Sequence, residues 1–317
     1  MRIRNSHTPS LPILLLLRLV MSNKTSDNVI LTIVRSMRPR QWTKNGFVFA
    51  GLLFTLDAHH SLSDFAKVTA AFILFSLLSG SIYIINDIAD AQNDRFHPRK
   101  CLRPIASGAL SKSAASIAAV ILICAGLVSS IFLGRWFALS ALAYVAMMAA
   151  YSFVLKRIVL LDVMTISAGF LLRAVAGAAC IGVTISSWLL ICTILMTLFI
   201  ALAKRRDELV SLQGVAGNHR ASLSDYSIPF LDQLVNITAS ATIMAYALYT
   251  FFSRTGTLHP YMMVTLPFVI YGIFRYLFLI HRGDGAGSPE VLLLKDKPLL
   301  IDLLLWILVC GIIVKLS

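Results

Sequence analysis

Four polar side chains with metal-binding chemistry stand close together where a long apolar run ends. They are Asn86, Asp87, Asp90 and Asp94. At positions i, i+1, i+4 and i+8 they share one face of a helix, where like charges repel one another. Carboxylate and amide oxygens are the ligands of hard divalent cations. The spacing therefore predicts that these four residues bind a metal ion, Mg²⁺ or Ca²⁺, and Mg²⁺ is our prediction.

Basic side chains follow in the same loop, at Arg95, Arg99, Lys100 and Arg103. A divalent ion flanked by Lys and Arg is the combination that binds a diphosphate and stabilises it as a leaving group. The alternative is a salt-bridged helix end without a ligand. On the first interpretation, the predicted catalytic residues are Asp87, Asp90, Asp94, Lys100 and Arg103.

Two further basic clusters follow later apolar runs. One contains Lys156 and Arg157, and the other contains Lys204, Arg205 and Arg206. Both should lie at the same side of a membrane as the acidic cluster, so they predict a substrate with more phosphate than one diphosphate. Basic residues at such positions also set membrane topology, which is the simpler interpretation.

A few polar side chains interrupt the apolar segments themselves. Gln41, Lys44 and Asn45 lie in the first segment and Arg173 lies near the middle of a later one. Such residues are unfavourable in hydrocarbon, so we expect them to face a cavity or the bundle interior and to contact substrate. For Lys44 the alternative is snorkelling to the interface. For Arg173 the expected partner is an anionic head group or an acidic side chain.

The elements that carry these residues are membrane helices. Of 317 residues, 58% are hydrophobic and 14% are charged, with a mean hydropathy of +0.81. Runs of about 20 apolar residues cross a bilayer core, and they recur along the chain. The sequence predicts an all-α, polytopic membrane bundle of about nine spans. They are Pro39–Leu56, Phe65–Ile85, Ala114–Leu133, Trp136–Leu155, Val163–Ile181, Trp188–Ala203, Leu231–Phe252, Met262–Ile280 and Leu299–Leu316.

The net charge of +13 is unevenly distributed between the two sides of these spans. Of 28 Lys and Arg residues, 22 fall at the amino terminus or in the even-numbered loops. The positive-inside rule places that side in the cytoplasm. We expect the protein to lie in the plasma (inner) membrane. We expect no nucleic-acid partner. A homo-oligomer is an alternative to a monomer.

Residues 1–36 are predicted to form an interfacial or disordered extension, because Arg18 interrupts the apolar run before Met21 and no cleavage site follows. Residues 37–317 are then a single transmembrane catalytic domain. Met21 is an alternative start.

The run "NDIADAQND" followed by "RPI" resembles the NDxxDxxxD signature of the UbiA-type prenyltransferase superfamily. This resemblance implies nine membrane helices and a polar cavity that faces the cytoplasm. Where the superfamily has a second acidic motif, this chain has "KRRDEL", which indicates a basic pocket instead. From Met37 onwards the chain resembles the decaprenyl-phosphate phosphoribosyltransferase branch. The segments that carry this likeness are "MRPRQWTKNGFVFAGLLF", "YSFVLKRIVLLDV", "FLLRAVAGAACIGVTISSWLL", "ALAKRRDEL" and "SPEVLLLKDKPLL".

The resemblance implies transfer of a 5-phosphoribosyl group from 5-phosphoribosyl 1-diphosphate (PRPP) to a polyprenyl phosphate, in the synthesis of a cell-envelope glycolipid precursor. Mg²⁺ on the acidic cluster would hold the diphosphate, the later basic clusters would bind the 5-phosphate or lipid phosphate, and Gln41, Lys44 and Asn45 would lie near the lipid phosphate. Two alternatives remain. One is an aromatic prenyltransferase that uses a polyprenyl diphosphate, and the other is a transporter or flippase for a phosphorylated lipid.

Overall fold

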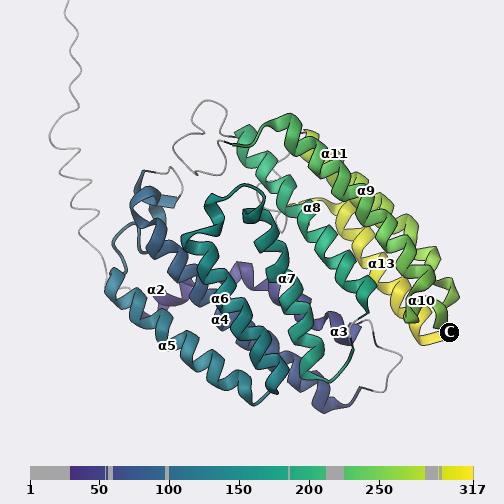
Figure 1. Cartoon of the computed structure of the whole chain (residues 1–317), viewed down its shortest axis with the longest axis horizontal. Coiled ribbons are helices and arrows are strands. Elements are labelled where there is room, and N and C mark those ends of the chain that lie inside the picture. Colours follow the sequence, from purple (N-terminus) through teal and green to yellow (C-terminus); the bar gives the residue numbers. More distant parts are fainter. Residues whose placement is uncertain are drawn as a thin grey trace, which may run out of the picture.

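The computed structural model describes residues 29–53, 55, 60–96, 100–184, 186–211, 225–282, 292 and 295–316 (Figure 1). These residues form helices joined by turns, and no strand occurs among them, as predicted. In chain order the helices are α2 (Val29–Ser36), η1 (Pro39–Phe49), α3 (Ala50–Leu53), α4 (Leu62–Arg95), η2 (Lys100–Leu102), α5 (Lys112–Ile131), α6 (Arg135–Phe153), η3 (Leu155–Arg157), α7 (Leu161–Cys180), α8 (Ser187–Ser211), α9 (Ile228–Phe252), α10 (Arg254–Leu258), η6 (Pro260–Thr265), α11 (Leu266–Arg282) and α13 (Lys297–Leu316).

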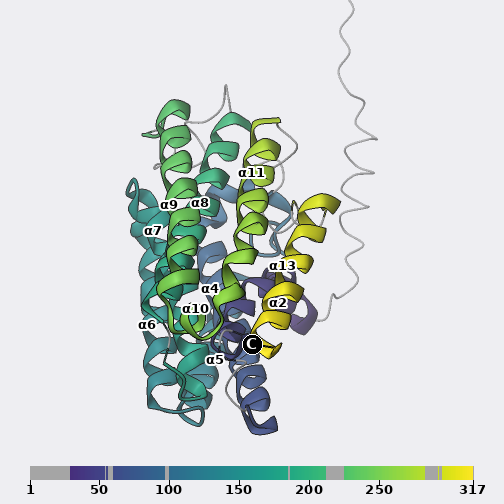
Figure 2. The ribbon, with the colours of Figure 1, turned by 90° about the vertical axis from the view of Figure 1, so that its right-hand side faces the viewer.

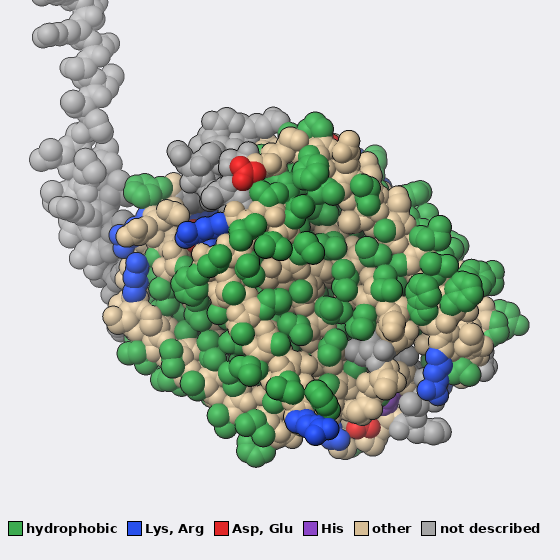
Figure 3. Space-filling model, in the orientation of Figure 1, with side chains coloured by type: hydrophobic (Ala, Val, Ile, Leu, Met, Phe, Trp, Pro, Cys, Tyr) green, Lys and Arg blue, Asp and Glu red, His purple; other side chains and the backbone are tan. Residues whose placement is uncertain are grey.

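Eight helical segments in this part of the chain are long and apolar enough to cross a membrane. They are α4, α5, α6, α7, α8, α9, η6 together with α11, and α13. Each coincides with one of the last eight predicted spans, although α4 and α8 run further than predicted. Apolar side chains cover most of the surface seen in Figure 3, whereas charged ones gather towards its edges. The protein is therefore a multi-pass membrane protein.

The first predicted span differs in form from the α-helix that we expected. Residues 39–49 are a 3₁₀ helix, η1, and one α-helical turn, α3, follows. A 3₁₀ helix rises about 2.0 Å per residue, so η1 and α3 together extend about 28 Å, close to the thickness of the hydrocarbon core. Both elements pack against α7, and η1 also packs against α4. The segment thus extends far enough to span a bilayer in fewer residues than an α-helix needs.

The helix that carries the acidic motif lies at the centre of one half of the bundle. In α4 and α7, 56% of the apolar span is buried, against 11% in α13. A capping box between Ser61 and Asp64 begins α4, which runs for 34 residues. That length is about 51 Å, roughly 20 Å more than the hydrocarbon core, so α4 projects from the bilayer. Residues 86–94 lie in its last turns.

The bundle has two halves that meet at α7. Helices α4, α5 and α6 lie on one side of α7, and α8, α9, α11 and α13 lie on the other, whereas η1 crosses α7 on its way to α3 (Figure 1). Helix α13 stands at the edge of the bundle in the view of Figure 2 and packs mainly against α11 and η6. Leu53 of α3 lines a small pocket together with residues of α13, and we call this place, where the first and last segments face each other, the α3–α13 seam.

The predicted boundary at residue 36 coincides with the end of α2. Thr32 and Ser36 of this helix are buried, whereas Val29, Ile30 and Leu31 are exposed. Residues 1–28, including Arg18 and Met21, lie outside the described residues. The single catalytic domain over 37–317 stays a prediction.

Gly177 of α7 allows the closest approach of the first segment. A Cβ atom there would lie 1.8 Å from the backbone oxygen of Val48 in η1. We expect Gly177→Ala to lower the midpoint of thermal unfolding of the purified protein by several degrees, because overpacking costs about 1–3 kcal/mol. Gly311→Ala in α13 is the matched control, since nothing lies within 4 Å of its Cβ position. Equal midpoints for the two variants would contradict the observed η1–α7 packing.

Candidate active site

The acidic face at the end of α4 contacts basic side chains from other segments. Asp87 and Asp94 are nearly buried, at 2% and 4% exposure. Arg103 Nη1 donates to both of them, at 3.1 Å to Asp87 Oδ1 and 2.6 Å to Asp94 Oδ2. Arg103 was predicted to neutralise a bound diphosphate, and here it contacts the carboxylates themselves, as in the alternative of a salt-bridged helix end. One guanidinium holds two carboxylates that would otherwise repel each other.

The other two residues of the motif contact Lys156. Its Nζ atom donates to Asp90 Oδ1 at 2.6 Å and to Asn86 Oδ1 at 3.2 Å. Asn86 Nδ2 in turn donates to Asp90 Oδ2 at 3.2 Å. Lys156 comes from η3, beyond α6, so the structure brings together the first and second predicted clusters.

Arg38 is a functional candidate that the sequence analysis missed. Its Nη2 atom donates to Asp87 Oδ1 at 2.5 Å, and its guanidinium lies over the Tyr83 ring at 5.0 Å. Arg38 adopts a left-handed conformation, with φ 53° and ψ 67°, directly before Pro39. Non-glycine residues in this region are strained, and such strain concentrates at functional sites. In the sequence, Arg38 counted only as a topological charge, and no local pattern linked it to a residue 49 positions away.

The remaining predicted residues of this end have different surroundings. Lys100 begins the short helix η2, which leads to Arg103. Arg157 is exposed beside the buried Lys156, whereas Arg99 lies outside the described residues. Arg157 is therefore adjacent in sequence to Lys156, and Lys100 lies three residues before Arg103.

The cluster at the end of α8 is more enclosed than predicted. Arg205 is 2% exposed, and its Nε atom donates to Asp162 Oδ2 at 2.7 Å while Nη1 donates to Glu208 Oε2 at 2.5 Å. Arg206 pairs with Asp232 of α9. Lys204 is half-buried. Because Arg205 already neutralises a fully buried carboxylate, its position favours a structural role over direct phosphate binding.

The intramembrane residues Asn45 and Arg173 belong to one buried network. Arg173 donates from Nε to Asn45 Oδ1 at 2.7 Å and from Nη2 to the Tyr144 hydroxyl at 2.8 Å. Asn45 donates to the hydroxyls of Ser76 and Ser79, at 3.0 and 3.1 Å. The network joins η1 to α4, α6 and α7. The partners of Arg173 are neutral oxygens and aromatic rings instead of the anion that we expected, so this is a packing network.

Gln41 and Lys44 are half-buried residues on a different face of η1 from Asn45. In a 3₁₀ helix, residues i and i+3 are eclipsed. Gln41 and Lys44 therefore form one row, and the buried Asn45 and Val48 form another. An α-helical period would have grouped Lys44 with Asn45. The structure thus separates Asn45 from Gln41 and Lys44, although the same contact with the substrate was predicted for all three.

The donor set at the end of α4 suits a hard cation, although it does not enclose one. In the described ranges, no three Asp, Glu, His or Cys side chains converge as a metal site. The carboxylates are paired with Arg38, Arg103 and Lys156 instead. Mg²⁺ usually binds to one or two carboxylates together with substrate phosphates and waters. The residues present therefore fit an ion that arrives with a phosphorylated substrate, and the four-residue metal site stays a prediction.

The sequence pattern of the UbiA prenyltransferase family matches residues 46–295. The chain belongs to the UbiA prenyltransferase family. It is 35% identical over 302 residues to a decaprenyl-phosphate phosphoribosyltransferase of Mycolicibacterium smegmatis, with 92% of this chain and 94% of that protein covered. A protein of the same name in Mycobacterium tuberculosis is 33% identical over 288 residues, covering 90% of this chain and 94% of the relative.

Among solved structures, a UbiA homolog from Archaeoglobus fulgidus bound to GPP and Mg²⁺ superimposes with a TM-score of 0.69 at 17% identity. The match covers 90% of this chain and 100% of that one. The resemblance inferred from the NDxxDxxxD motif is therefore confirmed, and so is the fold. The protein is a membrane transferase of the UbiA superfamily.

Arg103 stabilises the fold as well as the site. Replacing it by Met leaves two buried carboxylates with fewer cations, and breaking a buried pair costs about 3–5 kcal/mol. We expect Arg103→Met to lower the thermal unfolding midpoint clearly in a detergent melting assay. Lys112→Met is the control, because Lys112 is an exposed cation at the same end of the bundle. If both variants melt like the parent protein, Arg103 does not hold Asp87 and Asp94 as described.

Proposed function

We propose that this protein transfers a 5-phosphoribosyl group from PRPP to a polyprenyl phosphate and releases pyrophosphate. One observation carries the proposal: three basic side chains from separate segments converge on the acidic face of α4, at 2.5–3.1 Å. The near full-length similarity to decaprenyl-phosphate phosphoribosyltransferases supports the choice of substrates.

The paired charges suit the binding of a metal diphosphate. Mg²⁺, when bound, neutralises the diphosphate and stabilises it as a leaving group. Asp87, Asp90 and Asp94, with Asn86, would hold the ion. Arg38, Arg103 and Lys156 would then transfer their hydrogen bonds from carboxylate to phosphate oxygens. Every charge keeps an opposite charge beside it in this exchange, so no isolated ion is buried.

Several basic residues are candidates for the second phosphate of the donor. Arg157 is exposed next to Lys156, Lys100 lies in η2, and Lys204 and Arg206 end α8. Arg205 is the weakest candidate because Asp162 and Glu208 already occupy its guanidinium.

The lipid phosphate is already anionic, so its attack on C1 of the ribose needs positioning and electrostatic stabilisation but no strong base. Gln41 and Lys44 are our candidates for positioning it.

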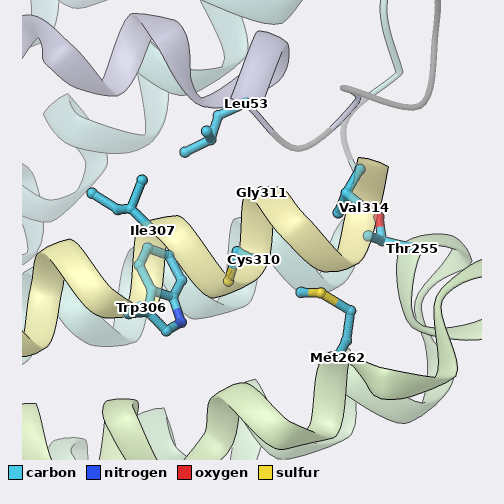
Figure 4. A pocket seen from close by; sticks show the side chains of 8 residues that line it. All are labelled: Leu53, Thr255, Met262, Trp306, Ile307, Cys310, Gly311 and Val314. Carbon is cyan, nitrogen blue, oxygen red and sulfur yellow. The ribbon is translucent and has the colours of Figure 1, made fainter. Parts of the chain in front are cut away.

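The lipid tail would enter sideways from the bilayer, along the seam between α3 and α13. Figure 4 shows a small pocket there, in which Leu53 of α3 lies opposite Ile307 and Gly311 of α13. Its lining is mostly apolar. Because η1 runs from Arg38 to this seam, a chain bound along it would have its phosphate near the acidic face. The tail length is left open by this geometry.

We place the acidic end of the bundle on the cytoplasmic side of the plasma membrane. The pair Lys156–Asp90 lies where α4 and α6 end, and Arg206–Asp232 lies where α8 ends and α9 begins. Most Lys and Arg residues of the chain lie on this side. The positive-inside rule supports this orientation. A water-soluble donor would then reach the site from the cytoplasm, and the product would be a precursor of a cell-envelope glycolipid.

The aromatic prenyltransferase remains the second candidate, since the Archaeoglobus fulgidus homolog is described as bound to GPP and Mg²⁺. Against it, the α8 end carries Arg205 and Arg206 in place of the second acidic motif. A transporter of phosphorylated lipids would move its substrate without cleaving a bond. The two experiments below separate these three activities.

The first experiment is an incubation of the purified protein in nanodiscs with ribose-labelled PRPP and a polyprenyl phosphate. We expect a labelled lipid whose formation stops when EDTA removes divalent cations and resumes when Mg²⁺ is added. The parallel reaction contains a polyprenyl diphosphate and 4-hydroxybenzoate. If the lipid stays unlabelled in the first reaction and 4-hydroxybenzoate is prenylated in the second, our proposal is wrong and the protein is an aromatic prenyltransferase.

The second experiment replaces one carboxylate. We expect Asp90→Asn to lower kcat for ribosyl transfer about 100-fold, because Asp90 would bind the ion that stabilises the leaving group. Asp64→Asn is the matched control, since Asp64 lies at the opposite end of α4 in the capping box. A turnover of Asp90→Asn within twofold of the parent rate would exclude a role for this carboxylate in bond cleavage.

A further inference from the structure

The turn that leads from η3 into α7 has an unusual backbone. Leu160 has φ 67° and ψ −42°, and the amide of Leu161 donates to the carbonyl oxygen of Val159 at 2.8 Å. This is a γ-turn with a positive φ at its centre, a rare and strained conformation. Among the described non-glycine residues, Leu160 shares a positive φ only with Arg38. Neighbouring groups must therefore hold this turn.

The phenol of Tyr226 holds the strained turn. It accepts a hydrogen bond from the Leu160 amide at 2.8 Å and donates one to Asp162 Oδ1 at 2.8 Å. Asp162 Oδ2 accepts from Arg205 at 2.7 Å. Tyr226, Asp162 and Arg205 are 5%, 0% and 2% exposed. Burial raises the pKa of Tyr226 to about 12, so its hydroxyl remains a donor at neutral pH.

This turn also determines where Lys156 lies. Lys156 occupies a 3₁₀ helix of three residues, which is too short to hold its own position. One side of η3 continues from α6, and the other side leads through Leu160 to α7. Lys156 donates to Asp90 at 2.6 Å from this helix and is 7% exposed. A shift of the turn would therefore move the Lys156 ammonium away from the acidic face.

We propose that Tyr226 is a positioning residue for the transfer site: through Leu160 and Asp162 it holds the η3–α7 turn so that Lys156 contacts Asp90. The expected effect of Tyr226 on the rate of transfer rests on the proposed function, whereas its effect on the conformation of the turn does not. The buried pair Arg205–Asp162 then orients the Tyr226 hydroxyl, because Asp162 accepts hydrogen bonds from both residues.

The structural consequence is measured by amide hydrogen exchange, which needs no substrate. In Tyr226→Phe the Leu160 amide loses its acceptor, so we expect the peptide covering residues 155–162 to exchange about tenfold faster, as the loss of a hydrogen bond predicts. Tyr271→Phe is the matched control, because Tyr271 is 46% exposed on α11. In a Leu160→Gly background, where glycine relieves the strain, the effect of Tyr226→Phe should be smaller. Unchanged exchange in Tyr226→Phe would overturn the proposal.

The kinetic consequence is measured by a double-mutant cycle with Lys156→Ala. If Tyr226 acts through Lys156, Tyr226→Phe lowers kcat/KM for PRPP about tenfold in the parent protein and less than twofold in the Lys156→Ala background. Equal losses in both backgrounds would overturn the positioning role. If the parent protein shows no transfer from PRPP, the proposed function fails, and the exchange experiment still decides whether Tyr226 holds the turn.

Discussion

Asp87 and Asp94 cannot be buried beside Asp90 on one helix end without cations next to them, and the candidate site depends on this constraint. Their partners come from three separate places: Arg38 before η1, Arg103 after η2 and Lys156 in η3. Because each pair crosses between segments, the same contacts close the end of the bundle and assemble the site. A ligand that brings both a cation and phosphate groups can replace these pairs without leaving any charge unpaired.

The bilayer imposes a second constraint on the first segment of the domain. Polar groups in an apolar environment need partners within the protein. Arg173 donates to Asn45, to the Tyr144 hydroxyl and to the backbone oxygen of Gly169. Gly177 permits the η1 backbone to approach α7. These contacts hold η1 in place, and Arg38 stands at its amino-terminal end, so the membrane-buried network supports the site above it.

Features of this protein that depend on local sequence patterns could be predicted best. Apolar length located the eight long spans, and the spacing of Asn86, Asp87, Asp90 and Asp94 correctly placed them on one helical face. Prediction was least successful for cations, because every basic cluster had the same topological explanation. Lys156 and Arg205 looked alike in sequence, yet one contacts the acidic face and the other neutralises a buried aspartate. Arg38 was missed for the same reason.

By itself, the sequence determined the all-helical membrane architecture, the membership in the UbiA family and the acidic face of α4. The architecture and the acidic face follow from apolar run length and from the helical period, which act over neighbouring residues. The family follows from the resemblance to the NDxxDxxxD signature. Only the tertiary structure decided which cation pairs with which carboxylate, that residues 39–49 form a 3₁₀ helix, and that Tyr226 reaches the turn at Leu160. Three of these pairs, Arg38–Asp87, Tyr226–Leu160 and Arg173–Asn45, join residues 49 to 128 positions apart. Helix packing alone brings such residues into contact, and no local pattern encodes it.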